Sequence, residues 1–183
     1  MNQIVKILFL SAILFSSSVS IAAGGDTVLF GVSFLKFDQE TEGPDVGTGE
    51  ESNTFYDVKL GFAASGLYLG GIYSVAGSET NSSETKRTGL GATLGFHGDV
   101  FFLDLSYFFQ AEHEAGAVLL GEGKGYAADF GINYPLTRNF YLGLQMSYKS
   151  FTFKNKEVAG VTTTPENKIV SELYPMINLG MMF

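Results

Sequence analysis

The stretch VFFLDLSYFFQ, residues 100–110, alternates strictly between two kinds of side chain. Successive side chains of a β-strand point to opposite faces, so a period of two indicates a strand with two different environments. One parity of this stretch is wholly apolar, whereas the other places Asp104 and Ser106 among aromatic residues. A charged residue in the middle of such a strand already shows that its two faces meet different solvents.

Seven further stretches repeat this pattern, and short and long connectors alternate between them. The short connectors include Ser65-Gly66, and the long polar ones cover residues 38–53, 77–87, 111–124 and 154–168. Turns at one end and long loops at the other are typical of an up-and-down transmembrane barrel. The sequence therefore predicts an all-β fold, an eight-stranded antiparallel up-and-down transmembrane β-barrel. Its strands are expected at 27–37, 54–64, 67–76, 88–96, 100–110, 125–134, 139–153 and 169–183.

The position of the charges decides between a soluble barrel and a membrane barrel. A soluble barrel of the lipocalin type has an apolar interior and a charged surface, whereas a barrel in lipid has the reverse. From the second stretch onward, one parity carries no charge and no amide. Apart from Ser33 and Lys36, the first stretch is apolar on both parities, and its facing stays open. The opposite parity, which we assign to the lumen, carries Asp57, Lys59, Asp104, Asp129, Lys149 and Glu172.

The N-terminal segment has the features of a secretory signal peptide. Lys6 precedes an apolar core, and small residues follow at Ser20 and Ala22. The apolar core is shorter than the roughly 20 residues that span a bilayer as a helix. We expect residues 1–22 to be a cleaved signal peptide, with cleavage near Ala22 or Ala23, and residues 23–183 to form the barrel domain.

Composition excludes several classes of function. The chain has no Cys, which rules out disulfides, thiolate metal sites and a Cys nucleophile. Its formal net charge of −8 argues against a nucleic-acid partner, because phosphate binding needs clustered Lys and Arg. Only 16% of residues are charged, below the roughly 25% of soluble domains. No cofactor motif is present, and none is expected.

The C-terminal segment INLGMMF, residues 177–183, alternates apolar residues and ends in Phe183. It resembles the assembly signal of bacterial outer-membrane barrels, carried here by Leu179, Met181 and Phe183. The mature chain as a whole is similar to small barrels of the OmpA-transmembrane-domain, OmpX and NspA kind. The resemblance implies a bacterial outer-membrane location, contact with outer-membrane lipid and lipopolysaccharide, and recognition by the barrel-assembly machinery.

Catalytic chemistry finds little support. The lipid A deacylases carry a late His-x-Ser pair, and the palmitoyltransferases use a His in the first outer loop; neither occurs here. His97 is expected in a short turn, and Glu112-His113-Glu114 is expected in an outer loop. These neighbours could orient a base or hold a metal, but adjacent residues seldom converge on one point. We therefore expect a protein that is not an enzyme.

Two charge clusters allow more than one interpretation. The first outer loop could bind a divalent cation or could simply be hydrated; its acids are Asp38, Glu40, Glu42, Asp45, Glu50 and Glu51. The lumenal charges could form a structural network or a cation-leaning ion path. The leading hypothesis is a monomeric membrane scaffold with surface-exposed loops, active in adhesion or envelope integrity. A narrow cation channel is the alternative, and a lipid A-modifying enzyme comes third.

Overall fold

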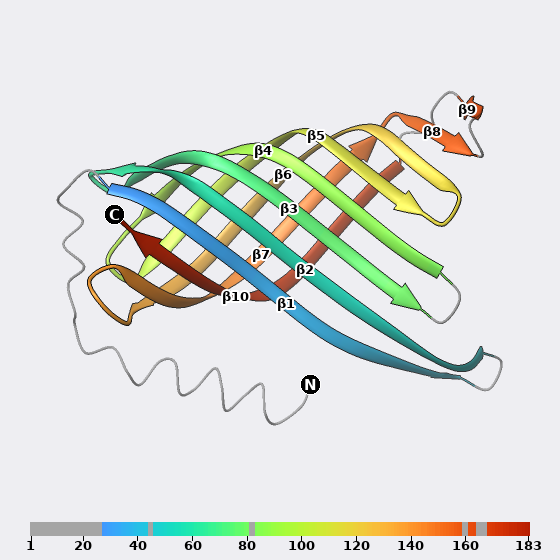
Figure 1. Cartoon of the computed structure of the whole chain (residues 1–183), viewed down its shortest axis with the longest axis horizontal. Coiled ribbons are helices and arrows are strands. Elements are labelled where there is room, and N and C mark those ends of the chain that lie inside the picture. The colour runs from blue at the N-terminus through green and yellow to red at the C-terminus, as the bar shows by residue number, and fades with distance from the viewer. Residues whose placement is uncertain (1–26, 44–45, 81–82, 159–160, 164–167) are drawn as a thin grey trace.

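The computed structural model describes residues 27–43, 46–80, 83–158, 161–163 and 168–183. The predicted signal peptide, residues 1–22, lies outside the described residues. Figure 1 shows long strands that wrap round one axis, with the start of β1 and the C-terminus at the same end. The strands are β1 (Thr27–Gly43), β2 (Val46–Ala64), β3 (Leu67–Thr80), β4 (Ser83–His97), β5 (Phe101–Ala115), β6 (Val118–Pro135), β7 (Phe140–Phe153), β8 (Asn155–Val158), β9 (Val161–Thr163) and β10 (Lys168–Met182).

Eight of these strands close into a barrel. Each of β1 to β6 pairs antiparallel with the next strand, and β10 pairs with both β7 and β1. The remaining two, β8 and β9, form a small hairpin that pairs with the outer end of β6. Among the described residues, no helix is long and apolar enough to cross a membrane. The predicted all-β, eight-stranded antiparallel barrel is confirmed.

A tight turn joins β2 to β3 where the sequence predicts it. Ser65 and Gly66 both have positive φ, 49° and 85°, as a two-residue hairpin turn of type I′ requires. The Gly66 carbonyl accepts a hydrogen bond of 2.7 Å from the backbone N–H of His97, the last residue of β4, at the same end of the barrel. Short connections therefore collect at the end that also holds the C-terminus (Figure 1).

The prediction of four long outer loops is wrong. Most of their residues lie in strands: β1 continues to Gly43, β3 to Thr80 and β5 to Ala115, each paired with the strand that follows. The stretch 154–168 contains the hairpin of β8 and β9. Ladder hydrogen bonds join backbone groups and do not depend on apolar side chains, so polar hairpins can continue beyond the membrane as sheet.

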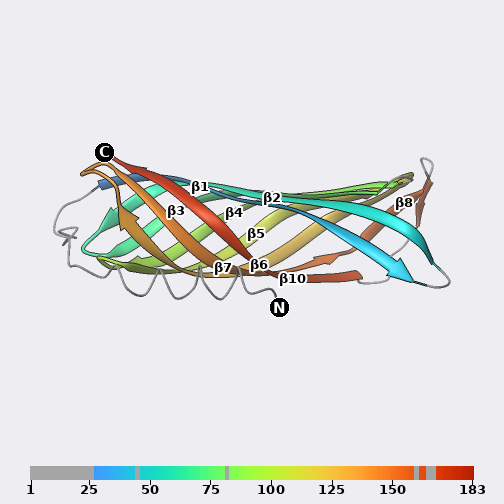
Figure 2. The same ribbon diagram turned by 90° about the horizontal axis from the view of Figure 1, so that it is seen from below.

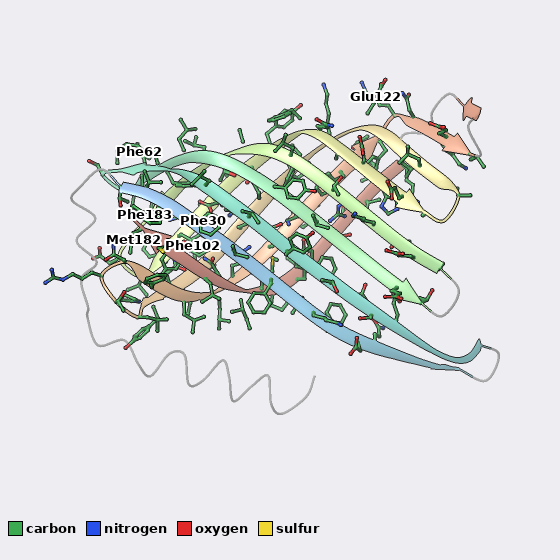
Figure 3. The ribbon with its side chains drawn as sticks, viewed as in Figure 1. Phe30, Phe62, Phe102, Glu122, Met182 and Phe183 are labelled. Carbon is green, nitrogen blue, oxygen red and sulfur yellow. The ribbon has the colours of Figure 1, made fainter. Side chains whose placement is uncertain are left out.

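The barrel exterior is apolar. Leu69, Leu94 and Leu105 are 65%, 61% and 58% exposed although they lie within long strands. Figure 3 labels Phe30 and Phe62 at the outer surface and Phe102 within the barrel, where it is buried. Burying one such side chain contributes about 1.5–3 kcal/mol, so a water-soluble barrel would not expose a continuous belt of them. The exterior is therefore built for lipid.

The facing of the first strand, left open by its sequence, is decided by register. Phe30 is opposite Leu60 and Ser33 is opposite Asp57 on β2, and directly opposite residues share a face of the sheet. Phe30 therefore joins the lipid-facing belt, whereas Leu29 and Ser33 are buried in the lumen.

The closing seam between β1 and β10 is shorter than the other ladders between the eight barrel strands. Val28 and Phe183 exchange both backbone hydrogen bonds, at 3.2 and 3.0 Å, and every second pair of an antiparallel ladder is bonded in this way. The pairing stops at Phe34–Ile177, and the next bonded position on β10 is Pro175, which has no N–H to donate. The two strands diverge from that point (Figure 2).

Candidate functional site

The lumen holds all six charged residues that the sequence assigns to it. They come from five strands: β2 supplies Asp57 and Lys59, and β5, β6, β7 and β10 supply one each. Five of the six are buried, and Glu172 is partly buried. Burying an isolated charge is costly, so each must find a partner of opposite sign or a hydrogen bond.

Lys59 is the centre of the larger group. Its Nζ lies 2.6 Å from Asp104 Oδ2 and 2.8 Å from Asp129 Oδ2. The Ser147 hydroxyl donates a further hydrogen bond of 2.5 Å to Asp129. His97 Nε2 lies 2.9 Å from the second oxygen of Asp104. One cation thus links strands β2, β5 and β6 across the inside of the barrel.

Lys149 forms a second, fully enclosed group. It donates hydrogen bonds to Asp57 and, at 2.7 Å, to the Ser74 hydroxyl. Lys149 and Asp57 are both 0% exposed. At this depth the ammonium group has no water to replace a lost partner, so the pair ties β2 and β7 together.

Arg87 completes the network, and the sequence analysis missed it. Its guanidinium donates two hydrogen bonds of 2.6 Å to the two oxygens of Glu172 and lies 4.3 Å from the Phe151 ring centroid. Arg87 was assigned to an outer loop because the fourth stretch was expected to begin at Thr88. It shares the inward parity of Gly89, and extending the strand by one residue would have found it.

Aromatic side chains fill the remaining lumen. Phe108, Phe151 and Phe153 form a buried cluster toward the outer end, and Tyr68 and Tyr141 form another at the turn end. Inward glycines make the room: a Cβ on Gly180 would overlap the Tyr141 ring. An eight-stranded barrel is only wide enough for side chains to fill, and this one is filled.

A cavity of about 20 Å³ lies beside Lys59, which is room for a single water molecule. It is lined by Tyr68, His97 and Asp104 among others, and the buried Tyr68 hydroxyl has no hydrogen-bond partner in the protein. The cavity is polar and small. It therefore suits a water molecule that is hydrogen-bonded to the ion-pair network, and it is too small for a substrate.

The Glu112-His113-Glu114 segment does not converge on one point. His113 faces the inside of the barrel wall, with its ring centroid 5.8 Å from that of Phe153, while Glu112 and Glu114 are exposed. Burial, with Lys168 and Arg87 nearby, lowers the pKa of the His113 imidazole. Within the described part of the chain, no group of three or more His, Cys, Asp or Glu side chains could hold a metal ion.

The residues expected to carry the assembly signal lie at the seam that closes the barrel. Leu179 faces lipid, Met181 is partly buried, and Phe183 is 65% exposed. The Phe183 carbonyl accepts hydrogen bonds from the Val28 N–H and, at 2.8 Å, from the Thr27 hydroxyl. Figure 3 shows Phe183 and Met182 beside the start of β1. The acids from Glu40 to Glu50 of the expected first loop have side chains outside the described residues.

Deleting Phe183 is expected to lower the amount of assembled barrel several-fold. The deletion removes the last bonded pair of the short β1–β10 ladder, and each such hydrogen bond contributes about 1 kcal/mol. The matched control is deletion of Ala117 at the tip of the β5–β6 hairpin, since loops tolerate changes in length. The measurement is the folded fraction in outer-membrane preparations; equal levels of the two variants would contradict the prediction.

No protein-family model matches this sequence, and no curated protein is similar to it. Among solved structures, Neisserial surface protein A (NspA) is similar with a TM-score of 0.50 and 14% identity, over 87% of this chain and 96% of that one. OmpT of Vibrio cholerae matches with a TM-score of 0.36 and 13% identity, and the alignment covers about half of its length (52%). The likeness to NspA is one of fold, and it agrees with the apolar exterior. This chain is thus an eight-stranded β-barrel of the outer-membrane type.

Proposed function

We propose that this protein is a closed scaffold in the bacterial outer membrane that presents its long hairpins to the outside. Its role is then adhesion or envelope integrity, exercised as a monomer, without catalysis. The observation that carries the proposal is the filled lumen, in which ion pairs and aromatic clusters leave a cavity of only about 20 Å³ beside Lys59.

The hairpins supply the display surface. Those of β1–β2, β3–β4, β5–β6 and β8–β9 all project at the end opposite the tight turns (Figure 1). In barrels of this type the short turns face the periplasm and the longer connections face outward. The same orientation places both ends of the barrel domain on the periplasmic side, where the assembly machinery would act on the last strand.

The lumenal charges weigh against the channel alternative. Four acids face three bases, Lys59, Lys149 and Arg87, and each of the four has a cation within hydrogen-bond distance. An ion would have to break these pairs and then pass the cluster of Phe108, Phe151 and Phe153. Hydrophobic constrictions block conduction by excluding water.

Planar-bilayer recording tests the proposal directly. We expect the purified barrel to give no conductance steps, because ion pairs and aromatic side chains of the described residues fill the lumen. The comparison is the variant Phe108→Ala/Phe151→Ala, which removes the outer aromatic cluster and should raise the frequency of openings. Both proteins should first show a different gel mobility before and after boiling, which reports a folded barrel. Cation-selective steps from the folded wild type would overturn the scaffold proposal in favour of the channel.

A further inference from the structure

The exterior of β1 to β4, just beyond the apolar belt, carries a row of residues with a lysine at each end. Lys36 is opposite Thr54, Thr54 is opposite Gly77, and Gly77 is opposite Lys86. These residues share the outward parity of the belt, so the row runs across four neighbouring strands on one face. Both lysines are exposed.

This basic row lies between two rows of different character. On the membrane side, the register aligns the exposed Phe34 and Tyr56, at the upper edge of the apolar belt, with Val75, which is buried, and Thr88, which is partly buried. On the outer side, it aligns Asp38, Ser52, Glu79 and Glu84. The surface therefore changes from apolar to basic to acidic with distance from the membrane.

The basic row is hollow at its centre. A cavity of about 270 Å³ is lined by Lys36, Lys86, Tyr56 and Gly77, and also by the acidic Glu79 and Glu84. Gly77 has no side chain, and its neighbour Thr54 is small, so the space between the two lysines stays open. Three strand spacings of about 4.8 Å separate the lysine backbones by about 14 Å. Their flexible four-carbon stems can bring both ammonium groups over one ligand.

The charges around the hollow are not used within the protein. In the described part of the chain, the salt bridges engage Lys59, Arg87, His97 and Lys149, and none engages Lys36 or Lys86. Glu79 and Glu84 are directly opposite each other, an arrangement that is unfavourable for like charges. Glu79 and Glu84 line the outer side of the hollow and would repel an anion, so an anionic ligand is confined to the side that the lysines line.

We propose that this hollow binds a phosphate group of a phosphorylated glycolipid in the outer leaflet. Lys36 and Lys86 hold the phosphate through charge-assisted hydrogen bonds, and the acyl chains lie along the apolar belt below Tyr56. The proposal rests on the orientation given above, since only then does the basic row lie at the level of the outer-leaflet head groups. Hydroxyl groups of Thr54 and Ser52 line the same hollow and can form hydrogen bonds with the sugar of the glycolipid.

The test compares lipid retention by three folded proteins in a zwitterionic detergent. They are the wild type, Lys36→Gln/Lys86→Gln, and the control Lys124→Gln/Lys154→Gln, which removes two exposed lysines elsewhere on the outer end. The probes are lipopolysaccharide, the same lipopolysaccharide after enzymatic dephosphorylation, and inorganic phosphate, with native mass spectrometry as the readout. Gel mobility before and after boiling checks that each barrel is folded.

We expect the wild type and the control to retain lipopolysaccharide equally, and the Lys36/Lys86 variant to lose affinity at least about tenfold, which corresponds to about 1.4 kcal/mol. Dephosphorylation should weaken binding to the wild type and leave the variant unchanged. Equal retention by the wild type and the variant, or indifference to dephosphorylation, would overturn the site. Binding of inorganic phosphate as tightly as the lipid would overturn the lipid assignment. A failure of the scaffold proposal would be detected separately, as conductance in the planar-bilayer recording.

Discussion

Lys149→Met is expected to destabilise the folded barrel by about 3–5 kcal/mol, since it leaves the Asp57 carboxylate buried without its cation. Lys149 and Asp57 are 0% exposed, and the one remaining neighbour in this group, Ser74, is uncharged. The measurement is urea unfolding in lipid vesicles. The control Lys154→Met, at an exposed position, should change the free energy of unfolding by less than about 0.5 kcal/mol.

The double variant Asp57→Leu/Lys149→Met separates the pair's own contribution from the penalty of an orphaned charge. Replacing a buried ion pair by apolar residues of similar volume is often neutral or stabilising, so the double variant should recover most of the loss. If it is as unstable as Lys149→Met, the loss comes from packing rather than from the buried charge, and our account of this group is wrong.

Leu105→Arg is expected to cost about 2–4 kcal/mol, because it places a cation at the middle of the lipid-facing belt. Leu105 lies midway between Phe101 and Phe109 on the apolar parity of β5 and is 58% exposed to the surroundings of the barrel. The comparison is Glu112→Arg at the outer end of the same strand, where the cost should fall below about 1 kcal/mol. Unfolding in vesicles measures both, and similar costs at the two depths would contradict a membrane-embedded belt.

The parity of the strands was accessible from sequence alone. In VFFLDLSYFFQ, Asp104 stands directly between Leu103 and Leu105, which is compatible with a strand only if the two faces of the strand meet different media. The same alternation in seven other stretches predicted the strand number, the antiparallel closure and the lumenal placement of Lys59 and Lys149. These features follow from the two-residue period of the strand and from the cost of placing charge in lipid, which are local properties.

The ends of the strands could not be predicted in the same way. Outside the membrane, Thr, Ser and Glu no longer alternate with apolar residues, so the pattern fades near Phe37 although β1 continues to Gly43. Backbone pairing with the neighbouring strand maintains the sheet there. For the same reason Arg87 was placed in a loop, whereas it is buried beside Glu172.

For every barrel strand except β1, the sequence by itself determined which residues face lipid and which face the lumen, because that choice depends only on position along the strand. The tertiary structure decided which lumenal charges meet. Lys59 joins Asp104 and Asp129, which are 45 and 70 residues away along the chain, whereas Asp57, two residues before it, pairs with Lys149 instead. Partners across a barrel depend on the stagger and register of all eight strands, which bring distant residues to the same height, and no local pattern encodes that height.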